Sequence, residues 1–171
     1  MRKQLTHART DAARKLAVVL TAVSTILLAA AFVFLYAYEP PYKPPPFEPE
    51  ANIGAPIPPD NMGYTELDAM GRFTFGIASN IYQQEDGSLK LYLTNKGDNE
   101  IYLMCEVIDI AKERTLYRSG LLRPGEYVES LYPIRKLKNE AVMVEICVYA
   151  LSPEDYVSIG TITLDNVLQP F

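Results

Sequence analysis

An uninterrupted apolar stretch near the N-terminus constrains the fold of this chain more than any other feature of its sequence. The residues from Leu16 to Tyr38 include no charged side chain and number 23. A helix rises about 1.5 Å per residue and the hydrocarbon core of a bilayer is about 30 Å thick, so about 20 apolar residues are enough to cross it. We therefore expect a transmembrane helix over residues 16–38, with the lipid bilayer as its partner.

Charge is distributed unevenly on the two sides of this stretch. Residues 1–15 carry five basic side chains and one acidic side chain, whereas residues 39–171 carry 11 Lys and Arg against 20 Asp and Glu. Basic residues mark the cytoplasmic flank of a membrane span, so residues 1–15 are expected to form a cytoplasmic basic tail. The segment 39–171 is then extracytoplasmic, and the chain is expected to be a single-pass protein of the cell membrane.

Two other interpretations of the apolar stretch compete with a membrane anchor. A cleaved secretory signal usually has an apolar region of about 7–15 residues and then a small-residue cleavage site. This stretch is longer, and its triplet Ala29-Ala30-Ala31 is followed by further apolar residues. The other alternative, a buried core helix, would need more surrounding protein than the rest of the chain supplies. We favour an uncleaved signal anchor, although a cleaved signal would also place the C-terminal part outside.

Prolines are concentrated directly after the apolar stretch. Nine of the 13 prolines lie between Pro40 and Pro59. Proline fixes φ, removes a backbone donor and pushes the preceding residue toward extended geometry. Residues 39–70 are therefore expected to form an extended, largely polyproline II linker that holds the folded part away from the bilayer. The composition of PPYKPPP also suits an SH3-like groove, a type of partner found mostly in the cytoplasm.

From about Gly71 onward, apolar and polar residues alternate with a period of two. Leu89, Leu91 and Leu93 fall on one side of an expected strand, and the run AVMVEICVYAL alternates in the same way. The alternation fails at Ile108, where the strand is expected to end or bulge, and it slips by one residue at Gly160, where a bulge is expected. About seven such short strands, with turn signals between them, are typical of two antiparallel sheets packed face to face. We expect residues 71–171 to form an all-β domain, an immunoglobulin-like antiparallel β-sandwich.

The two cysteines bear on this expectation. By strand parity Cys105 points into the core, whereas Cys147 shares its side of the strand with Glu145 and points outward. An immunoglobulin-type disulfide needs two inward cysteines on opposite sheets and usually packs on a tryptophan, which this chain lacks. We therefore expect two free thiols. The distant cysteines and His7 do not form a metal-ligand set, so no metal is expected.

One segment resembles a group of bacterial proteins. LTNKGDNEIYLMCEVIDIAKERTLYRSGLLRPGEYVESLYPIRKL has two asparagines around a turn, followed by Leu-Tyr, Ser-Gly-Leu and Pro-Gly, at Asn95, Asn99, Leu116, Tyr117, Ser119, Gly120, Leu121, Pro124 and Gly125. It resembles small exported or membrane-anchored proteins of Gram-positive (Firmicutes-type) bacteria. The resemblance covers most of the C-terminal domain and implies an immunoglobulin-like β-sandwich of uncharacterised function. It implies no site residues.

The exported segment shows no residue pattern typical of catalysis. The single histidine, His7, lies in the cytoplasmic tail, so Ser-His-Asp and Cys-His arrangements are not expected outside. No Gly-rich phosphate loop occurs, and an acidic segment disfavours nucleic acid. The paired acidic residues fall at expected turns, as solvated hairpin tips or, alternatively, as weak calcium sites. We expect no enzyme, no cofactor and no nucleic acid partner.

Tyrosines are the remaining candidates for a functional surface. Tyr92, Tyr102 and Tyr149 fall on the solvent side of three expected strands. If those strands are neighbours, the rings form an exposed strip suited to a protein partner; alternatively, the rings pair across strands and only stiffen the sheet. The sequence thus predicts a non-catalytic, membrane-anchored surface protein that binds another protein, such as an accessory subunit of a cell-envelope assembly. The alternative function is a cell-wall carbohydrate-binding module.

Overall fold

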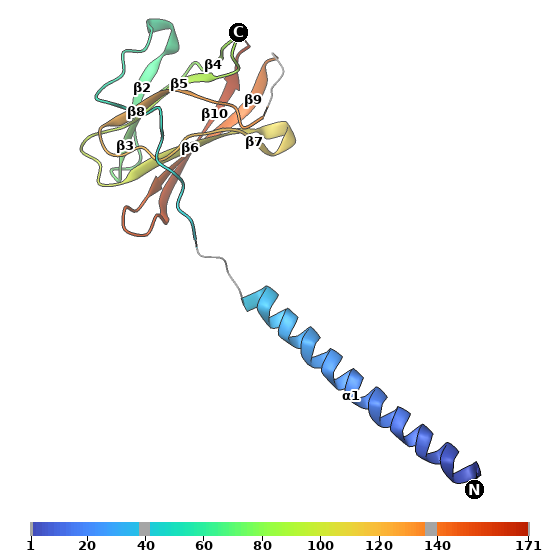
Figure 1. The fold of residues 1–171 in the computed structure, drawn as a ribbon. Coiled ribbons are helices and arrows are strands. Elements are labelled where there is room, and N and C mark those ends of the chain that lie inside the picture. The colour runs from blue at the N-terminus through green and yellow to red at the C-terminus, as the bar shows by residue number, and fades with distance from the viewer. Residues whose placement is uncertain (1, 38–41, 136–139, 171) are drawn as a thin grey trace. The chain divides into compact units, whose positions relative to one another are not determined.

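The computed structural model of the chain describes residues 2–37, 42–135 and 140–170 and divides into two units. The N-terminal unit ends at Lys43 and the C-terminal unit begins at Pro44. The N-terminal unit contains the helix α1 (Arg2–Ala37), and the C-terminal unit contains all the strands (Figure 1).

The helix α1 contains a window that is long and apolar enough to cross a membrane. This window runs from Arg14 to Tyr36, which is 23 residues, and its large apolar side chains are exposed, Leu16 among them. Tyr38, the predicted end of the span, lies outside the described residues. So many exposed apolar side chains in one window are unfavourable in water, so this part of the helix is suited to lipid.

We expect the full chain to stay with the membrane when membranes are washed with alkaline carbonate. An arginine at the centre of a membrane helix costs about 2.5–3.5 kcal/mol on insertion scales. The double variant Val23→Arg and Leu27→Arg should therefore move into the soluble fraction, and the matched variant Val23→Leu and Leu27→Val should not. Release of the wild-type chain by the wash would contradict the anchor.

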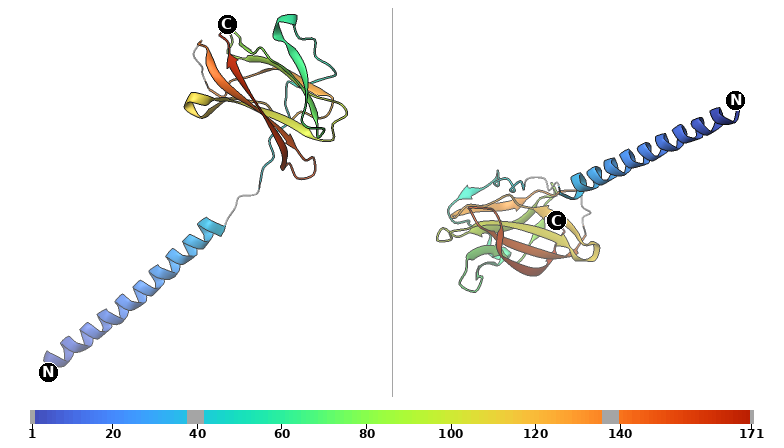
Figure 2. Two further views of the ribbon diagram at one scale, coloured as in Figure 1. Left: turned by 180° about the vertical axis from the view of Figure 1, so that it is seen from behind. Right: turned by 90° about the horizontal axis from the view of Figure 1, so that it is seen from below.

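The C-terminal unit consists of two antiparallel sheets that lie face to face (Figures 1 and 2). The first sheet contains, in spatial order, β1 (Asn52–Ile53), β8 (Glu126–Leu131), β5 (Leu89–Asn95), β3 (Thr74–Ala78) and β2 (Tyr64–Asp68), with β4 (Tyr82–Gln83) also paired to β5. The second contains β10 (Ser158–Leu168), β9 (Val142–Leu151), β6 (Tyr102–Asp109) and β7 (Arg114–Arg118). Two 3₁₀ turns, η1 (Asp60–Met62) and η2 (Ile110–Lys112), complete the described elements. The all-β prediction is confirmed: the described part of residues 71–171 contains eight strands where about seven were expected, and β1 and β2 precede this range.

One hydrophobic core fills the space between the sheets. The alternation read from the sequence places the correct side chains inside: Leu89, Leu91 and Leu93 from β5 are 0% exposed. Alternate residues of β6 and β9 meet them from the second sheet. Each such side chain contributes about 1.5–3 kcal/mol when fully buried, which is why two half-apolar sheets stack rather than remain apart.

One of the two predicted strand irregularities is a bulge in the expected strand. The pairing of β10 with β9 shifts between Ser158 and Gly160, so that Ile159 is an extra residue in β10. At Ile108 the sequence predicts that the strand ends or bulges, and β6 ends at Asp109 after continuous pairing with β9. The register shift between β6 and β7 places its extra residue, Leu116, in β7. In β10 the extra residue returns the next apolar side chains to the inner face.

The structure differs from the predicted linker over residues 39–70. The folded unit begins at Pro44, and β1, η1 and β2 all lie within that range. The Leu121 N–H donates to the Pro46 carbonyl (2.9 Å), and the Glu48 N–H donates to the Leu121 carbonyl (3.0 Å), so residues 46–48 lie parallel to Leu121 as an added edge. Proline fits this position because an edge strand needs no donor on its open side. Residues 46–48 therefore dock onto the folded domain, where the sequence predicts a spacer.

Candidate interaction edge

The structure separates the three predicted tyrosines. Tyr102 and Tyr149 lie on the adjacent strands β6 and β9, whereas Tyr92 lies on β5 in the other sheet. Tyr92 is only 6% exposed, and it packs against Met62 and Ala78. Tyr92 has a φ of 53° and lies where the register between β5 and β8 shifts. The prediction of one exposed strip of three rings is therefore wrong.

Tyr102 and Tyr149 belong to a cluster on the outer face of the second sheet. The partly buried rings of Phe47, Tyr102, Tyr149 and Tyr156 surround the buried Met104, Leu121 and Leu151. The Phe47 ring meets Tyr102 edge-on at 5.2 Å between centroids, and Arg123 lies 3.6 Å above Phe47. The Tyr149 hydroxyl donates to Glu106 (3.4 Å), and burial, with the neighbouring Cys147 and Glu106, raises the pKa of Tyr149 to about 12. These contacts favour a packing role that fixes residues 46–48 in place.

Both cysteines are free and buried. Cys105 faces Val148 across β6 and β9, and Cys147 faces Glu106, so the two thiols lie on opposite faces of one sheet and cannot bridge. Cys147 points outward as predicted, yet it is 6% exposed and donates to Glu145 (3.2 Å). Burial raises the pKa of Cys105 to about 12. Burial also raises the pKa of Cys147, and the hydrogen bond to Glu145 raises it further. Neither thiol has the depressed pKa of a reactive cysteine.

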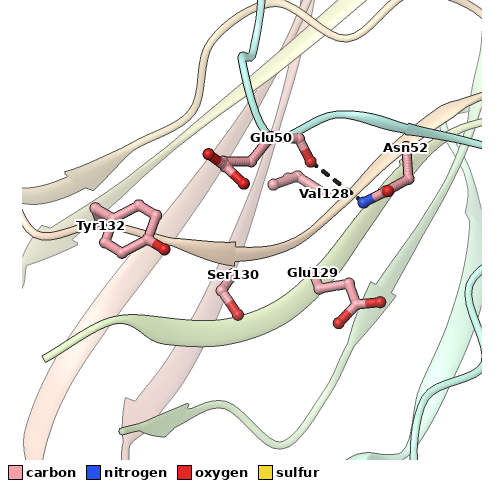
Figure 3. Close-up of a pocket in the computed structure, with 6 residues that line it drawn as sticks. All are labelled: Glu50, Asn52, Val128, Glu129, Ser130 and Tyr132. Atoms are coloured by element: carbon pink, nitrogen blue, oxygen red, sulfur yellow. Dashed lines mark hydrogen bonds between the residues drawn. The ribbon is translucent and has the colours of Figure 1, made fainter. Parts of the chain in front are cut away.

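A hollow of about 180 Å³ beside the end of β8 contains two carboxylates. Its lining residues are Glu50, Asn52, Val128, Glu129, Ser130 and Tyr132. Lys90 pairs with Glu129 at 3.1 Å. In Figure 3 the Glu129 carboxylate points away from Glu50, whose carboxylate is directed toward the Tyr132 ring. The two carboxylates therefore lack the converging geometry of an acid–base pair.

A second hollow of about 450 Å³ lies over the outer face of the first sheet. It is lined by Gly54, Ala55, Pro56, Tyr64, Glu66, Thr94, Asn95, Lys96, Gly97 and Gly125. The Tyr64 hydroxyl donates to Thr94 (2.9 Å), and Lys96 pairs with Glu66. Burial raises the pKa of Tyr64 despite that hydrogen bond. Most polar groups of this hollow are thus already satisfied by one another. Among the described residues, no group of three His, Cys, Asp or Glu side chains could hold a metal ion.

The strand β10 leaves a long backbone edge unpaired. It has 11 residues and ends its sheet, pairing with β9 on one side only. On the other side, the backbone hydrogen bonds of the described residues start only after the last residue of the strand. There the Gln83 N–H donates to the Gln169 carbonyl (2.9 Å), and the Gln169 N–H donates to the Ile81 carbonyl (3.2 Å). The side chain of Asn166 donates to Ser79 (2.9 Å). Residues 158–165 therefore present free N–H and C=O groups beside β9 (Figure 1, dark red next to orange).

The other edge strands carry the protection that β10 lacks. The strand β1 has 2 residues, and β2 has 5, of which Glu66 and Asp68 are charged. The strand β7 carries Arg114 and Arg118 and is capped by a bridge between Tyr117 and Pro133. Proteins usually protect sheet edges by short length, charge or proline. In β10 the sequence SIGTITLDNVL holds a single charge, Asp165, and neither lysine nor proline.

Inward side chains of β10 are only partly covered. Ile162 lies opposite Val148 and Leu164 lies opposite Ile146 across the ladder with β9. Val148 and Ile146 are 0% exposed, whereas Ile162 and Leu164 are half-buried against the same core. A further strand beside β10 would therefore cover apolar surface as well as satisfy backbone groups.

Comparison with known proteins assigns no function to the edge of β10. No family model matches the chain, and no curated protein or solved structure is significantly similar to it. Sequence reasoning identified β10 as a strand but missed its position at the edge of a sheet. The sequence feature that could have drawn attention to this segment is its composition, because its 11 residues have high strand propensity and include one charge.

Proposed function

We propose that the chain is a non-catalytic, single-pass membrane protein whose C-terminal domain, an immunoglobulin-like β-sandwich, lies outside the cytoplasm and binds another protein. The observation that carries this proposal is the unpaired edge of β10. Extended peptide segments bind such edges through main-chain hydrogen bonds, and alternate side chains supply specificity. An accessory subunit of a cell-envelope or surface assembly is the role that fits an anchor joined to a binding domain.

The proposed orientation is supported by charge. The helix α1 begins at Arg2, and the basic residues of the chain's first 15 positions lie before its apolar window or within the first two residues of it. The positive-inside bias then leaves the acidic strand domain outside. The resemblance of the segment around Asn95 and Gly120 to anchored proteins of Gram-positive bacteria supports the same placement.

Photo-crosslinking in native membranes tests the proposal. With benzoylphenylalanine at Thr163 on β10, we expect a protein adduct, because a bound strand would lie directly beside this position. The matched control places the same group at Thr65, an exposed threonine on the short edge strand β2. Adducts at Thr163 should exceed those at Thr65 several-fold. Absence of adducts at Thr163, or equal yields at both sites, would refute the proposal.

A cell-wall carbohydrate-binding module is the second candidate, and the hollow of about 450 Å³ lined by Tyr64 favours it. A sugar would stack on an aromatic ring and bond to the polar groups around it. Recovery of glycan without protein from the crosslinked membranes, lost in Tyr64→Ala and retained in Tyr132→Ala, would support this function over the first.

A further inference from the structure

We propose that the strand bound by β10 belongs to a different protein and alternates basic with apolar residues, a basic side chain lying beside Asp165. This inference rests on the proposed function and specifies the partner. It follows from the charges around the edge and from the two faces of β10.

The hairpin of β9 and β10 is acidic throughout. From Glu140 to the end of the chain, the sequence contains five Asp and Glu and no Lys or Arg. Asp165 of β10 lies directly opposite Glu145 of β9 in the ladder, on the outer face of the sheet. Like charges directly opposite each other destabilise a sheet.

This like-charge pair is uncompensated, in contrast to other carboxylates of the domain. Glu106 pairs with Arg118, Glu129 with Lys90 and Glu66 with Lys96. Within residues 42–135 and 140–170, neither Asp165 nor Glu145 takes part in an ion pair, and Glu145 accepts a bond from the Cys147 thiol (3.2 Å). The uncompensated charge therefore lies next to the open edge.

An added strand would place its side chains on both faces of the sheet in register with β10. Neighbouring strands lie about 4.7–4.9 Å apart, so a residue opposite Asp165 would be within reach of that carboxylate, and a long Lys or Arg side chain would also approach Glu145. On one side of this residue, the first and third residues along the added strand would lie opposite Leu164 and Ile162, face the core and cover these half-buried side chains. The expected partner strand thus has apolar residues at these two inward positions and a basic residue beside Asp165.

A second copy of this chain fits the edge less well. Two β10 strands side by side would bring two acidic hairpins together and add a second Asp165 where a cation is needed. Residues 39–171 carry a net charge of −9, so the repulsion would extend over the whole domain. Charge complementarity selects a basic strand from another protein.

The test uses the full chain in nanodiscs of neutral phosphatidylcholine and short fluorescent peptides as probes. One peptide alternates valine with lysine, and its control alternates valine with glutamate. We expect the lysine peptide to bind at least tenfold more tightly. Asp165→Lys should reverse this preference, whereas Glu140→Lys, an equal charge change at an exposed residue of the same hairpin, should largely preserve it. Thermal unfolding of both variants confirms that the domain remains folded.

Two further probes separate strand addition from simple charge attraction. The lysine peptide is N-methylated on alternate backbone nitrogens, in either phase. Binding should be lost in the phase that faces β10 and retained in the other, because only one set of N–H groups bonds to the edge. Equal binding of lysine and glutamate peptides, insensitivity to both methylation phases, or disulfide-linked dimers of a Thr163→Cys chain in place of peptide binding would overturn the inference. None of these results decides the photo-crosslinking experiment, so this inference can fail while the proposed function holds.

Discussion

Replacing Gly120 with alanine is expected to detach residues 46–48 from the second sheet. A Cβ at Gly120 would lie 2.5 Å from the Glu48 nitrogen and 2.7 Å from the Phe47 carbonyl carbon. These are backbone atoms, so a small side-chain adjustment cannot relieve the overlap. The segment is held by the Gly120 N–H on the Glu48 carboxylate (2.6 Å), by its two backbone bonds with Leu121 and by the Phe47 ring. The loss should amount to about 3 kcal/mol in unfolding free energy.

Hydrogen exchange measures this detachment directly. In Gly120→Ala of the full chain, the amides of Glu48 and Leu121 should exchange about 100-fold faster, and they should open at a lower free energy than the amides of β5, which report global unfolding. The matched control is Gly97→Ala, because a Cβ there has Gly125 as its nearest neighbour at 3.9 Å, an ordinary contact. Unchanged exchange at Glu48, or an equal acceleration in the control, would show that the segment is not held at Gly120.

Replacing Asn95 with alanine is expected to cost the domain about 3 kcal/mol or more, since it removes a link between the two sheets. Asn95 is 0% exposed. Its side chain donates to the carbonyls of Ile101 (2.9 Å) and Leu122 (3.0 Å) and accepts from Asn99 (2.6 Å). Asn99 in turn bonds both the N–H and the C=O of Thr74. The alanine variant would remove the side-chain donor from the Ile101 carbonyl and the acceptor from the Asn99 amide, and the Leu122 carbonyl would keep only its bond from the Leu103 N–H (3.0 Å).

Urea unfolding of the full chain, followed by near-ultraviolet circular dichroism of the tyrosines, gives the measurement. Asn61→Ala is the matched control, because Asn61 is exposed and should change stability by less than about 0.5 kcal/mol. Asn95→Asp should also destabilise, since a carboxylate cannot donate to the two carbonyls. An Asn95→Ala chain as stable as the wild type would show that this network does not join the sheets.

Asn95, Asn99 and Gly120 have identifiable physical roles in the fold. Asn95 and Asn99 tie the turn between β5 and β6 to both sheets. Gly120 leaves room for the backbone of residues 46–48. The sequence alone could not assign these roles, because Leu122, Thr74 and Glu48 lie 25 or more residues from the residues they contact.

The sequence by itself determined the features that depend on one segment and its surroundings. The apolar composition of residues 16–38 predicts a helix suited to lipid, and alternation with a period of two predicts which residues of β5, β6 and β9 face the core. It also predicted the bulge next to Gly160 and the end of β6 after Ile108. These features follow from local periodicity, because a helix or strand directs its side chains in the same way whatever its neighbours are.

Tertiary structure alone decided which segments meet. It placed Tyr92 in the sheet opposite Tyr102, docked the proline-rich residues 46–48 beside Leu121, and left β10 with an open edge where Asp165 faces Glu145. Alternation is the same for a central strand and for an edge strand, so periodicity could not reveal any of these. They arise from backbone hydrogen bonds and packing between residues distant in the chain, which the shared core of the two sheets selects.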